Sequence, residues 1–279
     1  MSQIATPGTD RYSTAEFMAI LIARYCGGDR ELLGSGGANQ VVSLAASRLA
    51  QLTVAPNLWL FSGGAGVYNS KFDTLPISTW DPRASHHAEC KILLADVVDN
   101  GTKGRYEGDR ISRGGAGYGG LQIDKYGNIN MIGIGGPYPK MKVRGPGTVG
   151  TLWLCSGPNN LYVEHHNKKI FVERVDYRSA AGWMNGGNER FETLNGRDGP
   201  QLVWSPICVC DFTEDDHRMR LVSVHPGHTV EEVVENTGFE LVIPDNVPET
   251  TPPTDWELEV LRTRVDRGGV LKKRRMTVG

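Results

Sequence analysis

The sequence predicts an α/β protein in which helices cover a parallel sheet. In the first quarter of the chain, amphipathic helical patterns alternate with short apolar runs, which is typical of helix-covered parallel sheets. The second half contains more runs with strand character, so we expect it to be richer in strands. At 279 residues the chain has the length of one large α/β domain or of two smaller ones, and we expect one.

The first elements are a helix, a short strand and a second helix. Ser13 and Glu16 form a capping-box pattern, and the apolar residues after them recur at helical spacing, which predicts a helix over residues 13–26. A short strand is expected near residues 31–33. A second helical pattern covers residues 40–52.

The apolar run at residues 58–61 predicts a buried strand that leads into Ser62 and a glycine turn. A similar glycine turn, at residues 34–37, follows the first strand. Reactive groups in parallel sheets gather at the carboxyl ends of the strands. Both turns are therefore candidate parts of a functional site.

The second half is predicted to contain several strands and then two helices. The segments with strand character are 128–134, 151–155, 169–175, 201–212 and 218–224. Thr229 and Glu232 form another capping-box pattern, which opens a helix that ends near Asn236. A proline-rich connector at residues 244–253 leads to a final helix over residues 254–265.

The composition excludes several classes of protein. A net charge of −2 and a pI near 6.4 give no general attraction to nucleic acid or anionic lipid. No apolar stretch approaches the ~20 residues of a membrane-spanning helix, and no signal peptide is recognised, so we expect a cytoplasmic protein without a membrane contact. The 5 cysteines are odd in number and mostly scattered, which suits free thiols in a reducing compartment.

Two short motifs resemble known sites but lack the required context. Residues 115–120 (GAGYGG) match a dinucleotide-binding pattern, yet an extended run and a turn follow them where a helix is required. Residues 86–90 (HHAEC) and 206–210 (PICVC) are similar to a zinc-deaminase signature, but the cysteine spacing is wrong. We therefore expect neither a dinucleotide site nor a metal site.

The cysteines and histidines left over from these motifs have simpler interpretations. Cys208 and Cys210 are interpreted as small core residues on one face of a strand. The paired histidines of the second half are interpreted as polar turn residues, and these are His165, His166, His225 and His228.

A set of segments spread along the chain carries a more specific signal. These segments are 56–65, 75–78, 81–82, 119–130, 142–147, 166–176 and 225–239. In this order they resemble the β subunits of family I CoA-transferases of the glutaconate type, and the likeness extends from about residue 14 to residue 267. The most specific piece is residues 122–128 (QIDKYGN).

The resemblance implies a three-layer α/β/α fold of the CoA-transferase type and a partner α subunit of similar fold, together forming an α2β2 heterotetramer. It also implies an active site at the subunit interface that binds CoA thioesters. Coenzyme A then enters as part of the substrate, and no permanently bound cofactor is expected. In the transferases, a glutamate at the end of a strand attacks the thioester, whereas this sequence has Ser62 at the matching position.

The departure at Ser62 puts the transfer mechanism in doubt. The sequence contains no Asp or Glu between Glu31 and Asp73, so no neighbouring carboxylate replaces the glutamate by a shift of register. A serine needs a nearby base to lose its proton, and no such arrangement is recognisable locally. On this criterion the chain looks closer to the branch of the family that opens a ring in CoA-linked steroid catabolites, as in cholesterol degradation, with the general base on the α subunit.

The remaining site candidates are glycines and polar residues, each with two open interpretations. Either the glycines supply N–H donors to a thioester or they merely turn the chain, and these are Gly63, Gly64, Gly119 and Gly120. The polar candidates are Gln122, Asp124, Lys125 and Asn128. They either contact acyl-CoA or form a polar turn. Lys125 is also a catalytic candidate, together with Ser62.

The sequence leaves three functions open and predicts the domain boundaries. The chain is expected to be part of an acyl-CoA hydrolase that cleaves a carbon–carbon or thioester bond, of a CoA-transferase, or of a complex in which it only completes the partner's pocket. We expect residues 1–12 to form an N-terminal tail, residues 13–267 one CoA-transferase-like domain, and residues 268–279 a basic C-terminal tail. The run 272–275 (KKRR) is expected to be solvated unless it contacts the partner subunit or CoA phosphates.

Overall fold

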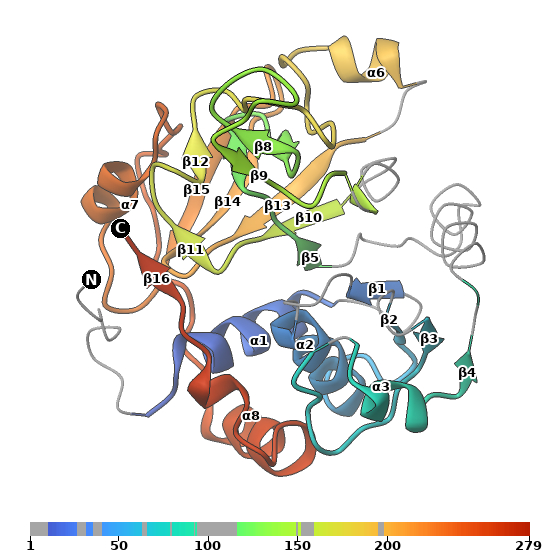
Figure 1. The fold of residues 1–279 in the computed structure, drawn as a ribbon. Coiled ribbons are helices and arrows are strands. Elements are labelled where there is room, and N and C mark those ends of the chain that lie inside the picture. Colours follow the sequence, from blue (N-terminus) through green and yellow to red (C-terminus); the bar gives the residue numbers. More distant parts are fainter. Residues whose placement is uncertain are drawn as a thin grey trace. The chain divides into compact units, whose positions relative to one another are not determined.

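The chain divides into two units that interleave in sequence (Figure 1). One unit contains residues 8–118 and 252–276, and the other contains residues 1–7, 119–251 and 277–279. The computed structural model describes residues 11–26, 32–35, 41–62, 66–78, 80–91, 93, 116–148, 150–151, 159–194 and 198–279. The domain boundaries given above remain predictions.

Helices α1 (Thr14–Tyr25) and α2 (Val41–Leu52) belong to the first unit, and both were predicted from the sequence. The predicted capping box is present, because the Glu16 N–H donates to Ser13 Oγ at 3.2 Å and the Ser13 N–H donates to Glu16 Oε2 at 2.8 Å. Together these bonds satisfy two N–H groups that would otherwise lack a partner at the helix start.

The sheet of this unit has the strand order β1-β2-β3-β4. Strands β1 (Leu32–Ser35) and β2 (Trp59–Ser62) are parallel, with Ser35 opposite Ser62, as the alternation of helix and strand predicts. Strands β3 (Val67–Tyr68) and β4 (Cys90–Lys91) are antiparallel to their neighbours, so the prediction of a purely parallel sheet is wrong here. For β3 the reason is the short link from Ser62 to Val67, since a parallel pair needs a crossover of about a dozen residues or more.

The C-terminal part of the first unit is a helix in two geometries. Helix α8 (Asp255–Val260) continues as a π-helix (Leu261–Val265), where the sequence predicts one regular helix over residues 254–265. Thr254 and Glu257 form a capping box at its start. The remaining elements of the unit are helix α3 (Pro82–His86), strand β5 (Ala116–Tyr118) and a 3-10 turn (Leu271–Lys273).

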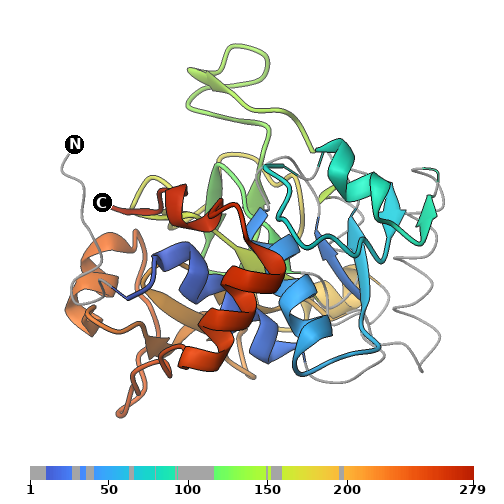
Figure 2. The same ribbon diagram turned by 90° about the horizontal axis from the view of Figure 1, so that it is seen from below.

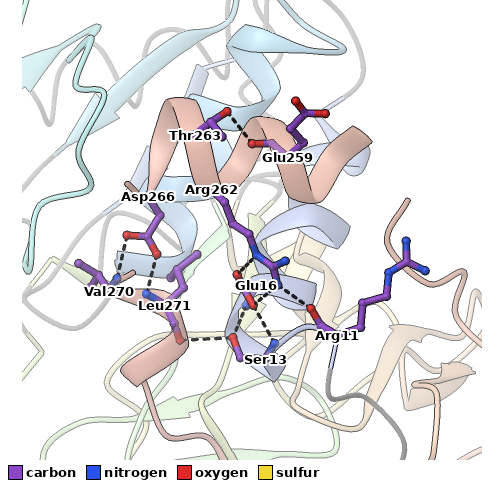
Figure 3. A network of polar contacts seen from close by, with 9 residues as sticks. All are labelled: Arg11, Ser13, Glu16, Glu259, Arg262, Thr263, Asp266, Val270 and Leu271. Carbon is purple, nitrogen blue, oxygen red and sulfur yellow. Dashed lines mark hydrogen bonds and ion pairs between the residues drawn. The ribbon is translucent and has the colours of Figure 1, made fainter. Parts of the chain in front are cut away.

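Ion pairs join this C-terminal helix to α1, and Figure 2 shows α8 in red beside the blue α1. The Arg24 guanidinium donates to both Glu257 carboxylate oxygens at 2.6 Å. One turn along, Arg262 Nε donates to Glu16 Oε1 at 2.7 Å (Figure 3). Glu16 therefore caps α1 and also binds Arg262 of the π-helical segment, which lies 246 positions away in the sequence.

The second unit is built on a sheet whose strands lie in the order β15-β14-β13-β10. The strands are β10 (Asn159–Tyr162), β13 (Pro200–Trp204), β14 (Cys208–Phe212) and β15 (Met219–Val224). The prediction of one strand over residues 201–212 is wrong, because the chain turns back at Ser205 and Pro206. Proline has no N–H for the ladder, and Ser205 Oγ accepts the N–H of Cys208 at 3.1 Å to close the turn.

Shorter strand pairs complete the second unit. Strand β6 (Gln122–Asp124) lies between β7 (Ile129–Asn130) and β12 (Phe171–Val172), β8 (Gly133–Ile134) pairs with β9 (Val143–Arg144), and β11 (His165–His166) pairs with β16 (Thr277–Val278). The run 128–134 is split because Asn130 Oδ1 accepts the Ile132 N–H at 2.9 Å. In the run 169–175 only β12 is a strand, and residues 152–155 of the run 151–155 lie outside the described residues.

Two helices and the chain end remain. Helix α7 (Val230–Asn236) was predicted, and Thr229 Oγ1 accepts the Glu232 N–H at 3.2 Å. The Glu232 carboxylate contacts His228 Nδ1 at 2.8 Å. Helix α6 (Glu189–Thr193) was not predicted. At the chain end the side chains of Lys272, Lys273 and Arg275 are exposed.

None of the helices in the described parts of the chain is long and apolar enough to cross a membrane.

Candidate active site

Ser62 ends strand β2 in the first unit, next to Val67 of β3. The residue is fully buried, with an exposed fraction of 0%. Its hydroxyl has no hydrogen-bond partner among the described residues. A buried hydroxyl without a partner costs free energy in the folded protein, so Ser62 offers a polar atom that the fold itself does not use. Gly63 and Gly64, predicted beside it, lie outside the described residues.

The other described candidates lie in the second unit, where Asp124 and Asn128 form a tight turn after β6. Asp124 Oδ1 accepts the N–H groups of Tyr126 at 3.1 Å and Asn128 at 3.0 Å. The Asn128 side-chain amide donates to both Asp124 carboxylate oxygens and to the Met184 carbonyl at 2.7 Å. Burial raises the pKa of Asp124, and the hydrogen bonds from Asn128 oppose the rise.

Gln122 begins a second buried network. Its side-chain oxygen accepts from the Asn130 amide at 2.7 Å and from the Asp176 N–H at 3.0 Å. The same Asn130 amide donates to the Gly133 carbonyl at 2.8 Å. Gln122 and Asn130 lie opposite one another on strands β6 and β7, which explains why the amide groups meet. The polar side chains thus tie β6 to the segments around residues 133 and 176.

Lys125 differs from its neighbours because its side chain is partly exposed. The ammonium group forms an ion pair with Glu173, whose side chain is 60% exposed. The hydrogen bond to Glu173 raises the pKa of Lys125, so the amine remains protonated at neutral pH. A general base needs a lowered pKa. Lys125 is therefore suited to act as a cationic contact and not as a base.

Gly119 and Gly120 lie where the backbone is crowded. A Cβ on Gly119 would lie 2.6 Å from the Tyr162 carbonyl oxygen, and a Cβ on Gly120 would lie 2.5 Å from Ile129 Cγ2. Packing within the second unit alone accounts for these two glycines. Their contact with a substrate remains a prediction.

The structure therefore buries Gln122, Asp124 and Asn128 in two separate hydrogen-bond networks, one around Gln122 and one that joins Asp124 to Asn128. It leaves Lys125 partly exposed next to Asp124 in the sequence. Ser62 belongs to the other unit. No described group of three or more His, Cys, Asp or Glu side chains is arranged to hold a metal ion.

The interpretation of all four paired histidines as polar turn residues is wrong for His166 and His225. Both are buried, each with an exposed fraction of 1%. His166 contacts Ser205 Oγ at 2.9 Å and Thr237 Oγ1 at 3.1 Å, and His225 contacts Thr250 Oγ1 at 2.9 Å. Burial lowers the pKa of His225 to about 3, so its imidazole is neutral at physiological pH.

The sequence did contain a weak signal for this buried cluster. Successive residues of a strand face opposite sides, and on β11 His165 is exposed while His166 is buried. Cys208 and Cys210 lie in the same region as fully enclosed thiols with their sulfurs 3.8 Å apart, which confirms their interpretation as core residues.

Comparisons with known proteins agree on the family to which the chain is similar. The model of the coenzyme A transferase family matches residues 28–236. One of the two subunits of the 3-oxoadipate CoA-transferase of Pseudomonas knackmussii is 32% identical over 255 residues, which is 90% of this chain and 92% of that protein. The cholesterol ring-cleaving hydrolase IpdB subunit of Rhodococcus jostii is 31% identical over 267 residues, again 90% of this chain and 92% of that protein.

A solved structure supports the same assignment. The crystal structure of glutaconate coenzyme A-transferase from Acidaminococcus fermentans superposes with a TM-score of 0.81 at 26% sequence identity. The match covers 97% of this chain and 99% of that one.

Proposed function

The chain belongs to the coenzyme A transferase family as a β-type subunit, and from that membership we propose that it forms, with an α partner of the same fold, an acyl-CoA hydrolase. The proposed reaction is the addition of water to a CoA-linked catabolic intermediate such as a steroid ring remnant. The bond cleaved is either a carbon–carbon bond, which opens the ring, or the thioester.

The observation that carries this proposal is the end of strand β2. Ser62 stands where the resemblance to the transferases places their glutamate, and no acidic residue occurs anywhere between Glu31 and Asp73. A carboxylate nucleophile is already ionised at neutral pH, whereas a serine hydroxyl needs a base. Without a nucleophile on this strand, water activated by the partner subunit is the simplest attacking group.

The chemistry follows from that assignment. A base on the α subunit takes a proton from water, and the oxygen adds to a carbonyl carbon of the substrate. In thioester cleavage the C–S bond then breaks and the CoA thiolate takes up the proton. In ring opening a C–C bond breaks and the carbanion, stabilised by a neighbouring carbonyl, is protonated. The Ser62 hydroxyl orients the water or the carbonyl by a hydrogen bond, and Lys125 offers a positive charge to an anionic substrate group.

CoA transfer is the second candidate, and the similarity to the 3-oxoadipate CoA-transferase favours it. In that case a nucleophile from elsewhere in the complex takes the place of the missing glutamate. The third candidate is a β-type subunit that contributes no group to the reaction and only completes the partner's pocket.

The test is a product analysis with the assembled two-subunit complex, an acyl-CoA donor and a free carboxylic acid as acceptor. The hydrolase proposal expects free CoA or a ring-opened CoA product at a rate that is independent of the acceptor. A new acyl-CoA that forms in proportion to the acceptor would establish transfer instead. Unchanged turnover in both Gln122→Ala and Lys125→Ala complexes would favour the purely structural role.

A further inference from the structure

A cationic hairpin projects from the second unit, and nothing in the proposed reaction uses it. We call residues 131–147 the hairpin arm. Its strands β8 and β9 pair antiparallel, with Gly133 opposite Arg144 and Ile134 opposite Val143 (Figure 1). The Lys142 N–H donates to the Gly135 carbonyl at 2.8 Å and extends the ladder by one step.

The exposed charges of the arm all have the same sign. Lys140, Lys142 and Arg144 are exposed, and none of them has an ion-pair partner among the described residues. From Lys125 to Val163 the sequence contains no Asp or Glu, although the chain as a whole has 32 acidic residues and a net charge of −2. The arm is thus a local positive region on a protein that is otherwise slightly negative.

An aromatic ring lies among these cations. Tyr138 at the tip of the arm is 61% exposed. The Arg144 guanidinium lies 5.1 Å from the centre of the Tyr138 ring and stacks on it. An exposed aromatic surface beside several cations is the combination that binds a base and its phosphates.

The arm is held in place by hydrogen bonds close to its tip, just beyond β8. The Gly135 N–H donates to Asp176 Oδ2 at 2.7 Å, and the Tyr177 hydroxyl donates to the Gly136 carbonyl at 2.6 Å. Asp176 is itself bonded to Gln122, which also binds Asn130. The network around Gln122 therefore positions the arm, and less conformational freedom is left to lose when a ligand binds.

We propose that the hairpin arm binds the nucleotide end of the acyl-CoA substrate. Lys140, Lys142 and Arg144 contact the phosphate groups, and the adenine ring stacks on the face of Tyr138 that Arg144 does not cover. This assignment rests on the proposed function, because it takes an acyl-CoA as the substrate. It adds a binding site for the part of the substrate that does not react.

The test is the affinity of the assembled complex for CoA, measured by calorimetry at low and physiological ionic strength. Lys142→Glu should weaken binding about tenfold or more at low ionic strength, which corresponds to about 1.4 kcal/mol or more. Because the interaction is between exposed charges, salt should reduce the difference between variant and wild type. Tyr138→Leu keeps the apolar bulk but removes the ring, and it should weaken binding of CoA several-fold.

Matched variants make the result specific. Lys168→Glu changes an exposed lysine of the same unit outside the arm and should bind CoA as the wild type does. Lys142→Arg keeps the charge and should retain most of the affinity. Dephospho-CoA, which lacks one phosphate group, should bind more weakly than CoA and lose less affinity in Lys142→Glu if that lysine contacts the missing group.

Three outcomes would overturn the proposal, and they can be told apart. CoA binding by the wild type that is unchanged in Lys142→Glu and Tyr138→Leu removes the arm from the substrate site but leaves the proposed function intact. No CoA binding by the wild type contradicts the proposed function itself. Loss of the α partner from the Lys142→Glu complex, seen by size-exclusion chromatography, would make the arm a subunit interface instead.

Discussion

At the scale of single residues, Ser62 allows stability and activity to be tested separately, because its hydroxyl has no hydrogen-bond partner among the described residues. Removing a buried hydroxyl that makes no hydrogen bond relieves a cost in the folded state, so Ser62→Ala should be as stable as the wild type or up to about 1–2 kcal/mol more stable. If the hydroxyl binds water or a carbonyl during turnover, kcat/KM should fall by about 5-fold to 150-fold, the equivalent of one hydrogen bond. Thermal unfolding and steady-state kinetics measure the two effects separately.

Ser43 is the matched control for this variant. Its hydroxyl is also fully buried and without a partner among the described residues, but it lies on α2 and was never predicted to contact a substrate. Ser43→Ala should therefore reproduce the stability effect without the loss of activity. Complete loss of activity in a folded Ser62→Ala complex, or a covalent adduct on Ser62 in the intact mass of the wild type, would contradict the role assigned to Ser62.

Substitution of Gln122 should cost more stability than substitution of Lys125. Gln122→Ala removes one of the two acceptors of the buried Asn130 amide and the acceptor of the Asp176 N–H, so it should cost about 1–3 kcal/mol of unfolding free energy. Lys125→Ala removes a surface ion pair and should cost less than about 1 kcal/mol. A large loss of turnover in Lys125→Ala with unchanged stability would support a substrate contact, and unchanged turnover would refute it. Chemical denaturation and kinetics on the same preparations decide between these outcomes.

At the scale of the elements, the ion pair between Arg24 of α1 and Glu257 of α8 makes the stability depend on pH. Burial acts to raise the pKa of Glu257, but the hydrogen bonds from Arg24 and Thr254 outweigh it and lower the pKa from 4.5 to about 2. Because the folded state holds this carboxylate ionised, the contribution is fully present above pH 4.5 and is lost as the pH falls towards 2. Arg24→Gln should lower stability at pH 7 and flatten the change of stability within that window.

Arg11→Gln provides the control for that experiment. Arg11 pairs with Asp255 on the same helix, but that pair is largely exposed. Exposed ion pairs contribute little, so this variant should keep both the wild-type stability and its pH dependence. A pH profile of Arg24→Gln that runs parallel to the wild type would show that Glu257 does not have the assigned role.

Local signals predicted helices α1, α2, α7 and α8 but not the five-residue helices α3 and α6, and they predicted the strand pairing poorly. The capping pattern at Ser13 placed α1 directly, because both bonds are made within four residues. The antiparallel strands β3 and β4 were missed, because strands of two residues show no periodicity. The break at Ser205 and Pro206 was also missed, although the proline itself argued against a continuous strand.

The sequence predicted which residues belong to the candidate site but not their burial or their hydrogen-bond partners. Residues 122–128 were found from their pattern, whereas their burial depends on partners far along the chain such as Asp176 and Met184. The cluster around His166 was missed for the same reason, because Ser205 and Thr237 lie 39 and 71 positions away. The alternation of His165 and His166 indicates at most which of the two is buried, and the partners of His166 cannot be recognised from a single sequence.

At the scale of the whole molecule, the family resemblance and the CoA-transferase type of α/β fold are confirmed by a family model over residues 28–236 and by a relative and a solved structure that cover 90% and 97% of the chain. The relatives are named as subunits of CoA-transferases and of a ring-cleaving hydrolase, which supports an α partner and leaves the reaction as the open question. The α2β2 stoichiometry, the cytoplasmic location and the absence of a bound cofactor stay predictions.

The most direct measurement of the central claim is turnover by the assembled complex in water enriched in ¹⁸O, with the products analysed by mass spectrometry. Hydrolysis of either bond places one oxygen from water in the newly formed carboxylate. We therefore predict one ¹⁸O atom per product carboxylate, with or without a free acid acceptor. Products that carry no label while CoA moves onto the acceptor would contradict a hydrolase and identify the complex as a CoA-transferase.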